Sequence, residues 1–350
     1  MEGTVHTKNT SIKAKIKALG KYLPMKVLSN EQLADEFPAW SVEKIYEKTG
    51  IKKRHISAEE ETCSYMAIQA AEDLFEKYNI AREDIDYILL CTQSPDYLLP
   101  TTACIVQNKL NIPKTAGALD FNLGCSGYVY GLSLAKGLIE SHQAKNILLI
   151  TSEMYSKHIN HKDKSVRTLF GDAATATLIG AVESEHDLIH SFIFGTDGSG
   201  ADNLIIPHGG SKEPISSLSS EEYEDSHGNV RSPKNLYMNG AEILTFTLVN
   251  VPKSINAVLE KAAISKENIN KVIFHQANKF MLDKLKKKIG FSDEQFLVSY
   301  EEYGNTVSST IPLGIINGIN NNEINSAQNI LICGFGVGYS WGGCIIESIG

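Results

Sequence analysis

The sequence lacks any apolar run long enough to cross a bilayer, which takes about 18 to 20 residues. Its first eleven residues, Met1 to Ser11, are polar and carry no hydrophobic signal core. A basic stripe is also missing, since 41 Asp and Glu residues outnumber 33 Lys and Arg residues and give a formal net charge of −8. These absences argue against membrane insertion and against a nucleic-acid partner. We therefore expect a cytoplasmic protein.

Cysteine and metal-ligand clusters are scarce. The six cysteines are scattered and none forms a Cys-x-x-Cys pair, which favours reduced thiols over a disulfide frame or a zinc site. His158 and His161 lie three positions apart, but no carboxylate or cysteine cluster completes a metal site around them. The glycine-rich segment 334–343 is not followed by the strand, loop, helix and acidic residue of a dinucleotide fingerprint. We expect neither a metal nor a cofactor.

What the sequence does have is a repeat at about half its length. The pattern of residues 74–90 returns at 258–274, a constant offset of 184 (258 − 74), and both copies have the pattern of a helix, a short loop and a strand. A second pair, 144–150 and 327–333, repeats Ala-x-Asn-Ile-Leu. Two copies of one α/β unit about a pseudo-two-fold axis bring equivalent strand ends and helix starts together, so we expect chemistry there.

The alternation of apolar strand-like runs with helical patterns predicts a layered α/β architecture. We expect a flexible tail over residues 1–11, an N-terminal half over 12–190 that carries the nucleophile, and a C-terminal half over 191–350. Between His208 and Asn235 the composition shifts to Ser, Glu, Gly and Pro, which predicts a surface insertion over 208–235. Strands are expected at 12–18, 87–92, 116–121, 147–151, 175–179, 272–275, 330–333 and 343–347, and helices at 64–78, 128–141 and 243–262.

Cys125 is the cysteine whose position indicates chemistry. It follows an apolar strand-like run and precedes a helical pattern, with Gly124 and Gly127 around it. Glycines let the backbone turn sharply, and a helix start directs free N–H groups and a positive dipole at the sulfur. Because the thiolate is the reactive form, we expect a nucleophile stabilised as a thiolate. The simpler interpretation, a small buried hydrophobe, is the one we expect for Cys91, Cys104, Cys333 and Cys344.

Two polar residues lie at matching places in the second half. The repeat carries Cys91 onto His275 (91 + 184), and the counterpart region of Cys125 contains Asn305. Taken alone, His275 is a core histidine and Asn305 a helix cap. Together, a cysteine, a histidine and an uncharged amide donor suit acyl-thioester chemistry with stabilisation of an oxyanion. The segment 334–342 either directs backbone N–H groups at the thioester oxygen or only permits tight packing at the pseudo-axis.

Five motifs occur in order along the chain. They are Gly-Cys-Ser-Gly at 124–127, Phe-Gly-Asp at 170–172, His-Gln-Ala-Asn at 275–278, Tyr-Gly-Asn-Thr at 303–306 and Gly-Phe-Gly-Val-Gly-Tyr-Ser-Trp-Gly at 334–342. Together they resemble the ketoacyl-acyl carrier protein synthase III family of thiolase-fold condensing enzymes. The resemblance runs from about Ile12 to Glu347. It implies a thiolase-like duplicated fold in αβαβα layers, a homodimer, and a place in fatty acid biosynthesis.

The resemblance also implies residue roles. Cys125 matches the acylated nucleophile, and His275 and Asn305 match the pair that assists malonyl decarboxylation and holds the enolate oxygen. Asn278 matches a supporting hydrogen-bond partner. The backbone N–H groups of Cys125 and Val337, the latter next to Gly336, match the oxyanion hole. The implied reaction is a decarboxylative Claisen condensation, in which an acyl thioester acylates the cysteine and malonyl-acyl carrier protein then loses carbon dioxide and attacks the acyl-enzyme.

The departures from the family pattern concern the acyl donor. Lys44 and Lys48 stand where members that use acyl-coenzyme A hold a tryptophan and an arginine, so the donor is either acyl-coenzyme A or an acyl-carrier protein. Leu99 stands where many members place a phenylalanine that reaches across the dimer to floor the partner's acyl pocket. This smaller side chain predicts room for a longer, branched or substituted acyl group.

Carrier docking also departs from the family. Phe280 stands where some members use an arginine to meet the carrier protein. We expect nearby lysines to replace it, although a solvated helix face is the simpler interpretation of such a run. These lysines are Lys284, Lys287 and Lys288.

Other functions remain open at the sequence level. The order Cys, His, Asn also describes papain-like proteases, but their cysteine signature is absent here. A non-catalytic carrier-binding subunit usually lacks the nucleophile. A thiolase-fold acyltransferase or thioesterase, which passes the acyl group from the cysteine to a non-malonyl acceptor, is the closer alternative. Release of carbon dioxide from labelled malonyl-carrier protein separates it from a condensing enzyme.

Overall fold

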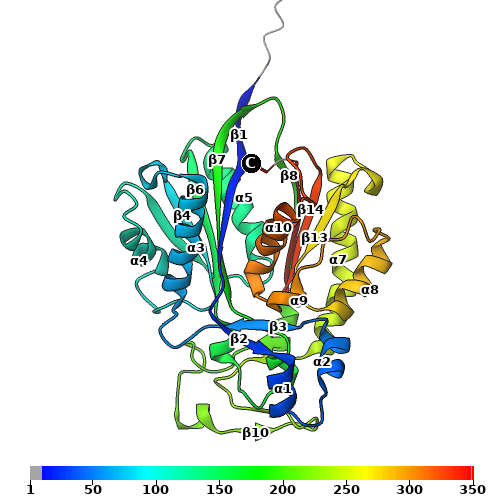
Figure 1. Ribbon diagram of the computed structural model, residues 1–350. Coiled ribbons are helices and arrows are strands. Elements are labelled where there is room, and N and C mark those ends of the chain that lie inside the picture. Colours follow the sequence, from blue (N-terminus) through cyan, green and yellow to red (C-terminus); the bar gives the residue numbers. More distant parts are fainter. Residues whose placement is uncertain (1–9, 348) are drawn as a thin grey trace, which may run out of the picture.

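The computed structural model describes residues 10–347, 349 and 350 and places two β-sheets side by side (Figure 1). The first sheet has the order β1 (Ser11–Tyr22), β7 (Ala173–Ser184), β6 (Asn146–Glu153), β4 (Tyr87–Cys91), β5 (Gly117–Phe121). The second has the order β8 (Ile189–Thr196), β15 (Ser340–Ile346), β14 (Ile330–Gly336), β13 (Lys271–Phe274). Residues 1–9 of the predicted tail lie outside the described residues.

The two sheets repeat one another. β4 runs parallel to β6 and β6 antiparallel to β7, just as β13 runs parallel to β14 and β14 antiparallel to β15. In each sheet an antiparallel fourth strand follows, β1 in the first and β8 in the second. The fifth strand, β5, has its counterpart in a single parallel bridge from Val272 to Phe296. The predicted duplication is confirmed by this shared strand order and direction.

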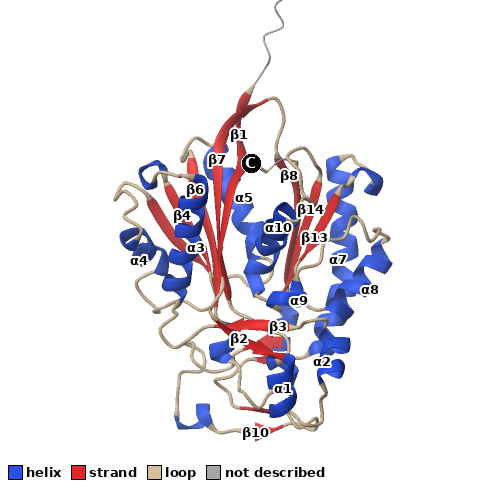
Figure 2. Ribbon diagram, viewed as in Figure 1, coloured by secondary structure: helices blue, strands red, loops and turns tan. Residues whose placement is uncertain are grey.

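Helices fill three layers around the two sheets (Figure 2). On the outer face of the first sheet lie α3 (Cys63–Tyr78) and α4 (Thr102–Lys109), and outside the second lie α7 (Gly240–Ala262) and α8 (Lys279–Ile289). Between the sheets, α5 (Gly127–Glu140) and α10 (Thr310–Asn320) contact strands of both. The predicted αβαβα layering is therefore confirmed.

The middle helix α10 is apolar almost all round because both its faces are covered, whereas α5 also has an exposed side, on which Leu134 is 46% exposed. In α10, eight residues from Thr310 to Gly318 are buried. Small residues bring the helices close to the strands: a Cβ at Gly131 of α5 would lie 2.5 Å from a methyl group of Leu149 in β6. Such packing sets the two helix starts, and the loops before them, at one fixed place between the sheets.

Smaller elements cover one end of the layers, at the bottom of Figure 1. They are β2 (Lys26–Ser29), α1 (Asn30–Glu36), α2 (Val42–Thr49), β3 (Lys53–Ile56), α6 (Lys164–Arg167), β9 (Leu204–Ile205), β12 (Tyr237–Met238) and α9 (Tyr300–Tyr303). Gly50 ends α2 at φ 71°, and a Cβ there would lie 2.5 Å from Lys279 of α8. This close approach fixes α2 against the second half of the molecule.

The division of the chain into two halves stays a prediction from the sequence. The structure shows which elements lie near the predicted division and within the 208–235 segment. β8 begins at Ile189, so the second sheet starts just before the expected 190/191 division. The 208–235 segment holds only a single-turn helix at 217–220 and a small hairpin of β10 (Tyr223–Glu224) and β11 (Val230–Arg231). No helix in the described part of the chain is long and apolar enough to cross a membrane.

Candidate active site

Cys125 lies between the end of β5 and the start of α5, where its side chain is 4% exposed. The backbone of β14 passes directly beside it. A Cβ at Gly336 would lie 2.6 Å from the Cys125 sulfur, and one at Gly334 would lie 2.5 Å from the Cys125 carbonyl oxygen. Glycine is therefore required at both positions, which supports the packing interpretation of the 334–342 motif for these two residues.

The electrostatics of Cys125 correct one expectation from the sequence. Burial raises the pKa of the Cys125 thiol to about 12, and the buried Glu153 carboxyl acts in the same direction. The backbone N–H groups of Val337 and Cys125 face the sulfur and lower this pKa, but they do not offset the burial. The resting side chain is a neutral thiol rather than the expected thiolate, because the helix start is enclosed by protein and not open to water.

His275 follows β13 directly, at the place that corresponds to Cys91, the last residue of β4. Its backbone N–H donates to the Cys333 carbonyl at 2.8 Å, and its Nδ1 lies 2.8 Å from the Thr310 hydroxyl. That hydroxyl donates to the Val307 carbonyl at 2.9 Å, so its oxygen accepts a hydrogen bond from the Nδ1–H of His275, and Nε2 carries the lone pair. This tautomer is assigned from the hydrogen-bond network. Burial lowers the pKa of His275 to about 3, so the ring is neutral.

Asn305 is fixed through both its backbone and its side chain. Its N–H donates to the Leu169 carbonyl at 2.9 Å, and its carbonyl accepts from the N–H of Gly171 at 3.0 Å. The side-chain Oδ1 accepts from the N–H of Val307 at 3.0 Å. Since a backbone donor identifies the oxygen end of the carboxamide, Nδ2 is the free end, and no partner for it is found within the described residues. Asn305 thus offers a donor to the space beside it.

Val307 links the two polar residues. Its N–H holds Asn305, and its carbonyl holds the Thr310 hydroxyl that orients His275. Its φ is 56°, a left-handed conformation that a β-branched residue rarely adopts. Such backbone strain costs on the order of 1–3 kcal/mol and persists where the surrounding structure requires it. Here it sets the direction of both side chains from one short turn, Val307–Ser309, ahead of α10.

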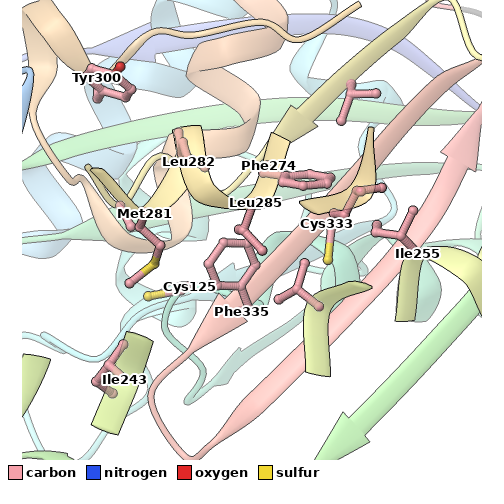
Figure 3. Close-up of a cluster of buried hydrophobic side chains, with 14 of the residues drawn as sticks. Cys125, Ile243, Ile255, Phe274, Met281, Leu282, Leu285, Tyr300, Cys333 and Phe335 are labelled. Atoms are coloured by element: carbon pink, nitrogen blue, oxygen red, sulfur yellow. The ribbon is translucent and has the colours of Figure 1, made fainter. Parts of the chain in front are cut away.

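One cavity is lined by Cys125, His275 and Asn305 together. The three residues that the sequence predicted to converge are brought to the same space. The rest of the wall is mostly apolar, and Figure 3 shows Met281 and Ile243 beside Cys125. Such a wall excludes water, which strengthens hydrogen bonds to any charge that develops inside. Among the described residues, no group of three His, Cys, Asp or Glu side chains is arranged to hold a metal ion.

Of the remaining predicted site residues, some line the cavity and others lie on the surface. Asn278 and Gly336 line the cavity, although the Oδ1 of Asn278 also caps α8 by accepting from the N–H of Met281 at 2.9 Å. Leu99 is 82% exposed and does not line the cavity of its own chain. The predicted docking lysines lie on α8: Lys284 stacks 4.6 Å above the Phe280 ring, and Lys287 and Lys288 are exposed.

Several residues that support this site were missed by the sequence reasoning. Thr310 orients His275. Gln276 follows His275, and its Oε1 accepts a hydrogen bond from the N–H of Ser299, just before α9, at 2.8 Å. Glu153, at the end of β6, accepts from the Ser308 hydroxyl at 2.9 Å. The rule that strand ends carry the chemistry, applied to β6 as it was to β5 and β13, would have found Glu153. The role of Thr310 had no sequence signal of its own.

The exact correspondence between the halves is also refined. Ser126 and Ser309 are the N-cap residues of α5 and α10, an offset of 183 (309 − 126). The counterpart of Cys125 is thus Ser308, and Asn305 lies three residues before it. Asn305 thus comes from the same loop as the counterpart of the nucleophile but not from the equivalent position, and His275 comes from the end of β13.

Comparisons with known proteins agree with this geometry. Models of the 3-oxoacyl-[acyl-carrier-protein] synthase III family match residues 119–198 and, for its C-terminal part, residues 259–348. A β-ketoacyl-[acyl-carrier-protein] synthase III of Clostridium perfringens is 38% identical over 95% of this chain and 99% of its own length. The chain belongs to the 3-oxoacyl-acyl carrier protein synthase III family. A synthase III of Lactococcus lactis is likewise 38% identical over 95% of this chain and 99% of its own length.

Solved members of the synthase III family share the whole fold. A crystal structure of a 3-oxoacyl-(acyl-carrier-protein) synthase III superimposes with a TM-score of 0.95 at 49% identity, over 96% of this chain and 99% of that one. The corresponding synthase of Burkholderia xenovorans superimposes with a TM-score of 0.88 at 35% identity, over 98% of this chain and 96% of that one. The thiolase-like fold predicted from the sequence is confirmed.

Proposed function

We propose that this protein is a 3-oxoacyl-acyl carrier protein synthase III, an acyltransferase that condenses an acyl thioester with malonyl-acyl carrier protein. One observation carries the proposal: a buried thiol, a neutral imidazole and a carboxamide with a free N–H end all face one apolar-walled cavity. The donor is an acyl-coenzyme A or an acyl-carrier protein, as the sequence left open.

In the first half-reaction the Cys125 sulfur attacks the acyl thioester carbon. The new C–S bond forms and the donor C–S bond breaks, while the thiol proton passes to Nε2 of His275 and on to the departing sulfur, so the ring is neutral again when the donor leaves. Backbone N–H groups of Val337 and Cys125, which already face the sulfur, are placed to stabilise the oxyanion of the tetrahedral intermediate. Acyl transfer to the cysteine preserves a thioester and so retains its reactivity.

In the second half-reaction malonyl-carrier protein enters the same cavity. Its carboxylate leaves as carbon dioxide, and the electron pair forms an enolate whose oxygen accepts from Nδ2 of Asn305. Nε2 of His275 takes a proton from water as this negative charge develops and becomes the second donor. The enolate carbon attacks the acyl-cysteine, the C–S bond breaks, and the Cys125 sulfur regains its proton from His275. An apolar wall favours this step, since loss of carbon dioxide converts a charged substrate into a neutral gas and a delocalised anion.

The carrier protein and a second subunit are the proposed partners. Acidic carriers suit the exposed Lys287 and Lys288 on α8, the helix whose first turn lines the cavity. A homodimer is supported by β5, the last strand of its sheet, because an uncovered strand edge invites pairing with another chain. Leu98 and Leu99 are 95% and 82% exposed in the loop after β4, the strand beside β5. A cytoplasmic location stays a prediction from the sequence.

Mass spectrometry of the intact protein tests this function. After incubation with acyl-coenzyme A and acyl-carrier protein donors, we expect one acyl mass on Cys125, which Cys125→Ala abolishes. Cys104→Ala is the matched control, because Cys104 is an exposed cysteine away from the cavity lining. Addition of malonyl-carrier protein should then release carbon dioxide and a 3-oxoacyl product. An adduct that is passed to water or to another acceptor, with no carbon dioxide, would instead identify a thioesterase or a different acyltransferase.

A further inference from the structure

A second hollow opens beside the nucleophile. Leu204 lines both this hollow and the cavity described above, and Val337, whose N–H faces the Cys125 sulfur, forms part of its wall. A Cβ at Gly124, the residue before Cys125, would lie 2.6 Å from the Gln93 side-chain oxygen and 2.6 Å from a methyl group of Val337. The hollow is therefore adjacent to the place where an acyl group on Cys125 would lie.

Three polar side chains face this hollow in a connected network. The Tyr155 hydroxyl donates to Oε1 of Gln93, and Nε2 of Gln93 donates to Oδ1 of Asn122 at 2.9 Å. The backbone N–H of Gln93 is also held, by Glu153 at 3.1 Å. Burial raises the pKa of Tyr155 well above its ordinary value, so its hydroxyl stays protonated. The network is uncharged, and its hydrogen bonds fix which end of each amide is the oxygen.

The network leaves hydrogen-bonding capacity unused. One N–H of Gln93, both N–H groups of Asn122 and a lone pair of the Tyr155 oxygen have no partner within the described residues. A hydrocarbon chain that covered these groups would remove them from water without replacing their hydrogen bonds, at a cost of about 1–3 kcal/mol for each group. The lining thus suits an acyl group with a polar substituent better than a plain alkyl chain.

The chemistry of the lining selects the kind of substituent. Within the described part of the chain no charged side chain lines the hollow, so a carboxylate or an ammonium group would enter without a counter-ion. A hydroxyl group fits, because it both accepts from the amide N–H groups and donates to the tyrosine oxygen. Resting on the proposed function, we propose that the hollow receives the acyl part of the donor and that the preferred donor carries a short hydroxyacyl group. Gln93 and Tyr155 are then specificity-determining residues for the acylation step.

Two near-isosteric donors test this proposal. The 3-hydroxybutyryl and 3-methylbutyryl thioesters differ by a hydroxyl group in place of a methyl group, and both are offered on coenzyme A and on carrier protein, with each enantiomer of the hydroxy acid. The rate at which mass appears on Cys125 is measured for each. We expect the wild-type protein to prefer one hydroxyacyl enantiomer by at least about tenfold, the effect of roughly one hydrogen bond.

Variants assign the preference to the network. Tyr155→Phe and Gln93→Leu should bring the two rates to within about threefold of each other, mainly by slowing the hydroxyacyl donor. Tyr130→Phe is the matched control and should keep the preference, since the Tyr130 hydroxyl lies by the Gly195 carbonyl, outside the hollow.

The possible outcomes distinguish failure of the hydroxyacyl proposal from failure of the proposed condensing function. Equal or faster acylation of the wild-type protein by 3-methylbutyryl donors would overturn the hydroxyacyl proposal and leave the condensing function intact. A preference that survives in both network variants would equally overturn it. Failure of every acyl thioester to modify Cys125 would overturn the proposed function, and the hydroxyacyl inference with it.

Discussion

Gly336 lies against Cys125 so closely that a Cβ added to it would come within 2.6 Å of the sulfur. This contact joins the end of β14, in the second half of the molecule, to the proposed nucleophile of the first. It also explains why the glycine-rich motif and the cysteine motif occur together.

The first prediction concerns this contact. Gly336→Ala should displace the Cys125 side chain and slow acylation by at least about 100-fold, since small errors in position are costly in a preorganised site. Stopped reactions analysed by mass spectrometry measure the rate. Gly137→Ala is the matched control on α5, because a Cβ there meets no atom of residues 10–347, 349 and 350 within 4 Å. Normal acylation in Gly336→Ala would show that the close packing is irrelevant to the sulfur.

Asn305→Asp separates the two half-reactions. An aspartate keeps the oxygen that accepts from the N–H of Val307 but replaces the Nδ2 donor with a second oxygen. We expect near-normal acylation of Cys125 and loss of condensation by about 100-fold or more, because the enolate loses a donor and meets a negative charge. Radiolabelled carbon dioxide release measures the second step, and the acyl adduct shows that the variant is folded. If acylation and decarboxylation were slowed equally, the role of Asn305 as a donor to the enolate would be wrong.

His275→Ala should affect the steps unequally. Acylation continues at a reduced rate because water can take the thiol proton, whereas decarboxylation loses its second donor and should fall by about 100-fold to 10,000-fold. The comparison uses the same adduct and carbon dioxide assays. Since Nδ1 is held by Thr310, Thr310→Val should show a milder version of the same pattern. A histidine variant with full carbon dioxide release would contradict the account.

Glu153 predicts a pH dependence of stability. Burial raises its pKa to about 8 from an ordinary value of 4.5. Between these values the folded protein holds a proton that the unfolded chain releases, so its contribution to stability is present below pH 4.5 and lost as the pH rises through 8. Glu153→Gln should therefore gain stability relative to wild type between pH 5 and pH 8, on the order of a few kcal/mol by urea unfolding. If the free energies of unfolding of the two proteins changed with pH in parallel, the raised pKa of Glu153 would be excluded.

Much of this arrangement follows from the sequence, and the reason lies in the repeat. Local patterns placed the strands that carry Cys91 and His275 at equivalent positions, and the pseudo-two-fold then required their ends to meet. The protonation state of Cys125 was predicted wrongly, because the sequence shows the helix start but not the residues that bury it. Thr310 and the Tyr155–Gln93–Asn122 network also escaped detection, since their contacts join segments far apart in the chain and no local pattern records them.

A single-turnover experiment tests the central claim, that one cavity carries both half-reactions. The wild-type protein is first acylated on Cys125, freed of excess donor and mixed with malonyl-carrier protein, and the adduct mass and the carbon dioxide are followed together. The account predicts that the adduct disappears at the rate at which carbon dioxide is released, one molecule for each acyl group, with a 3-oxoacyl-carrier protein as product. Loss of the adduct as free acid, without carbon dioxide, would contradict it.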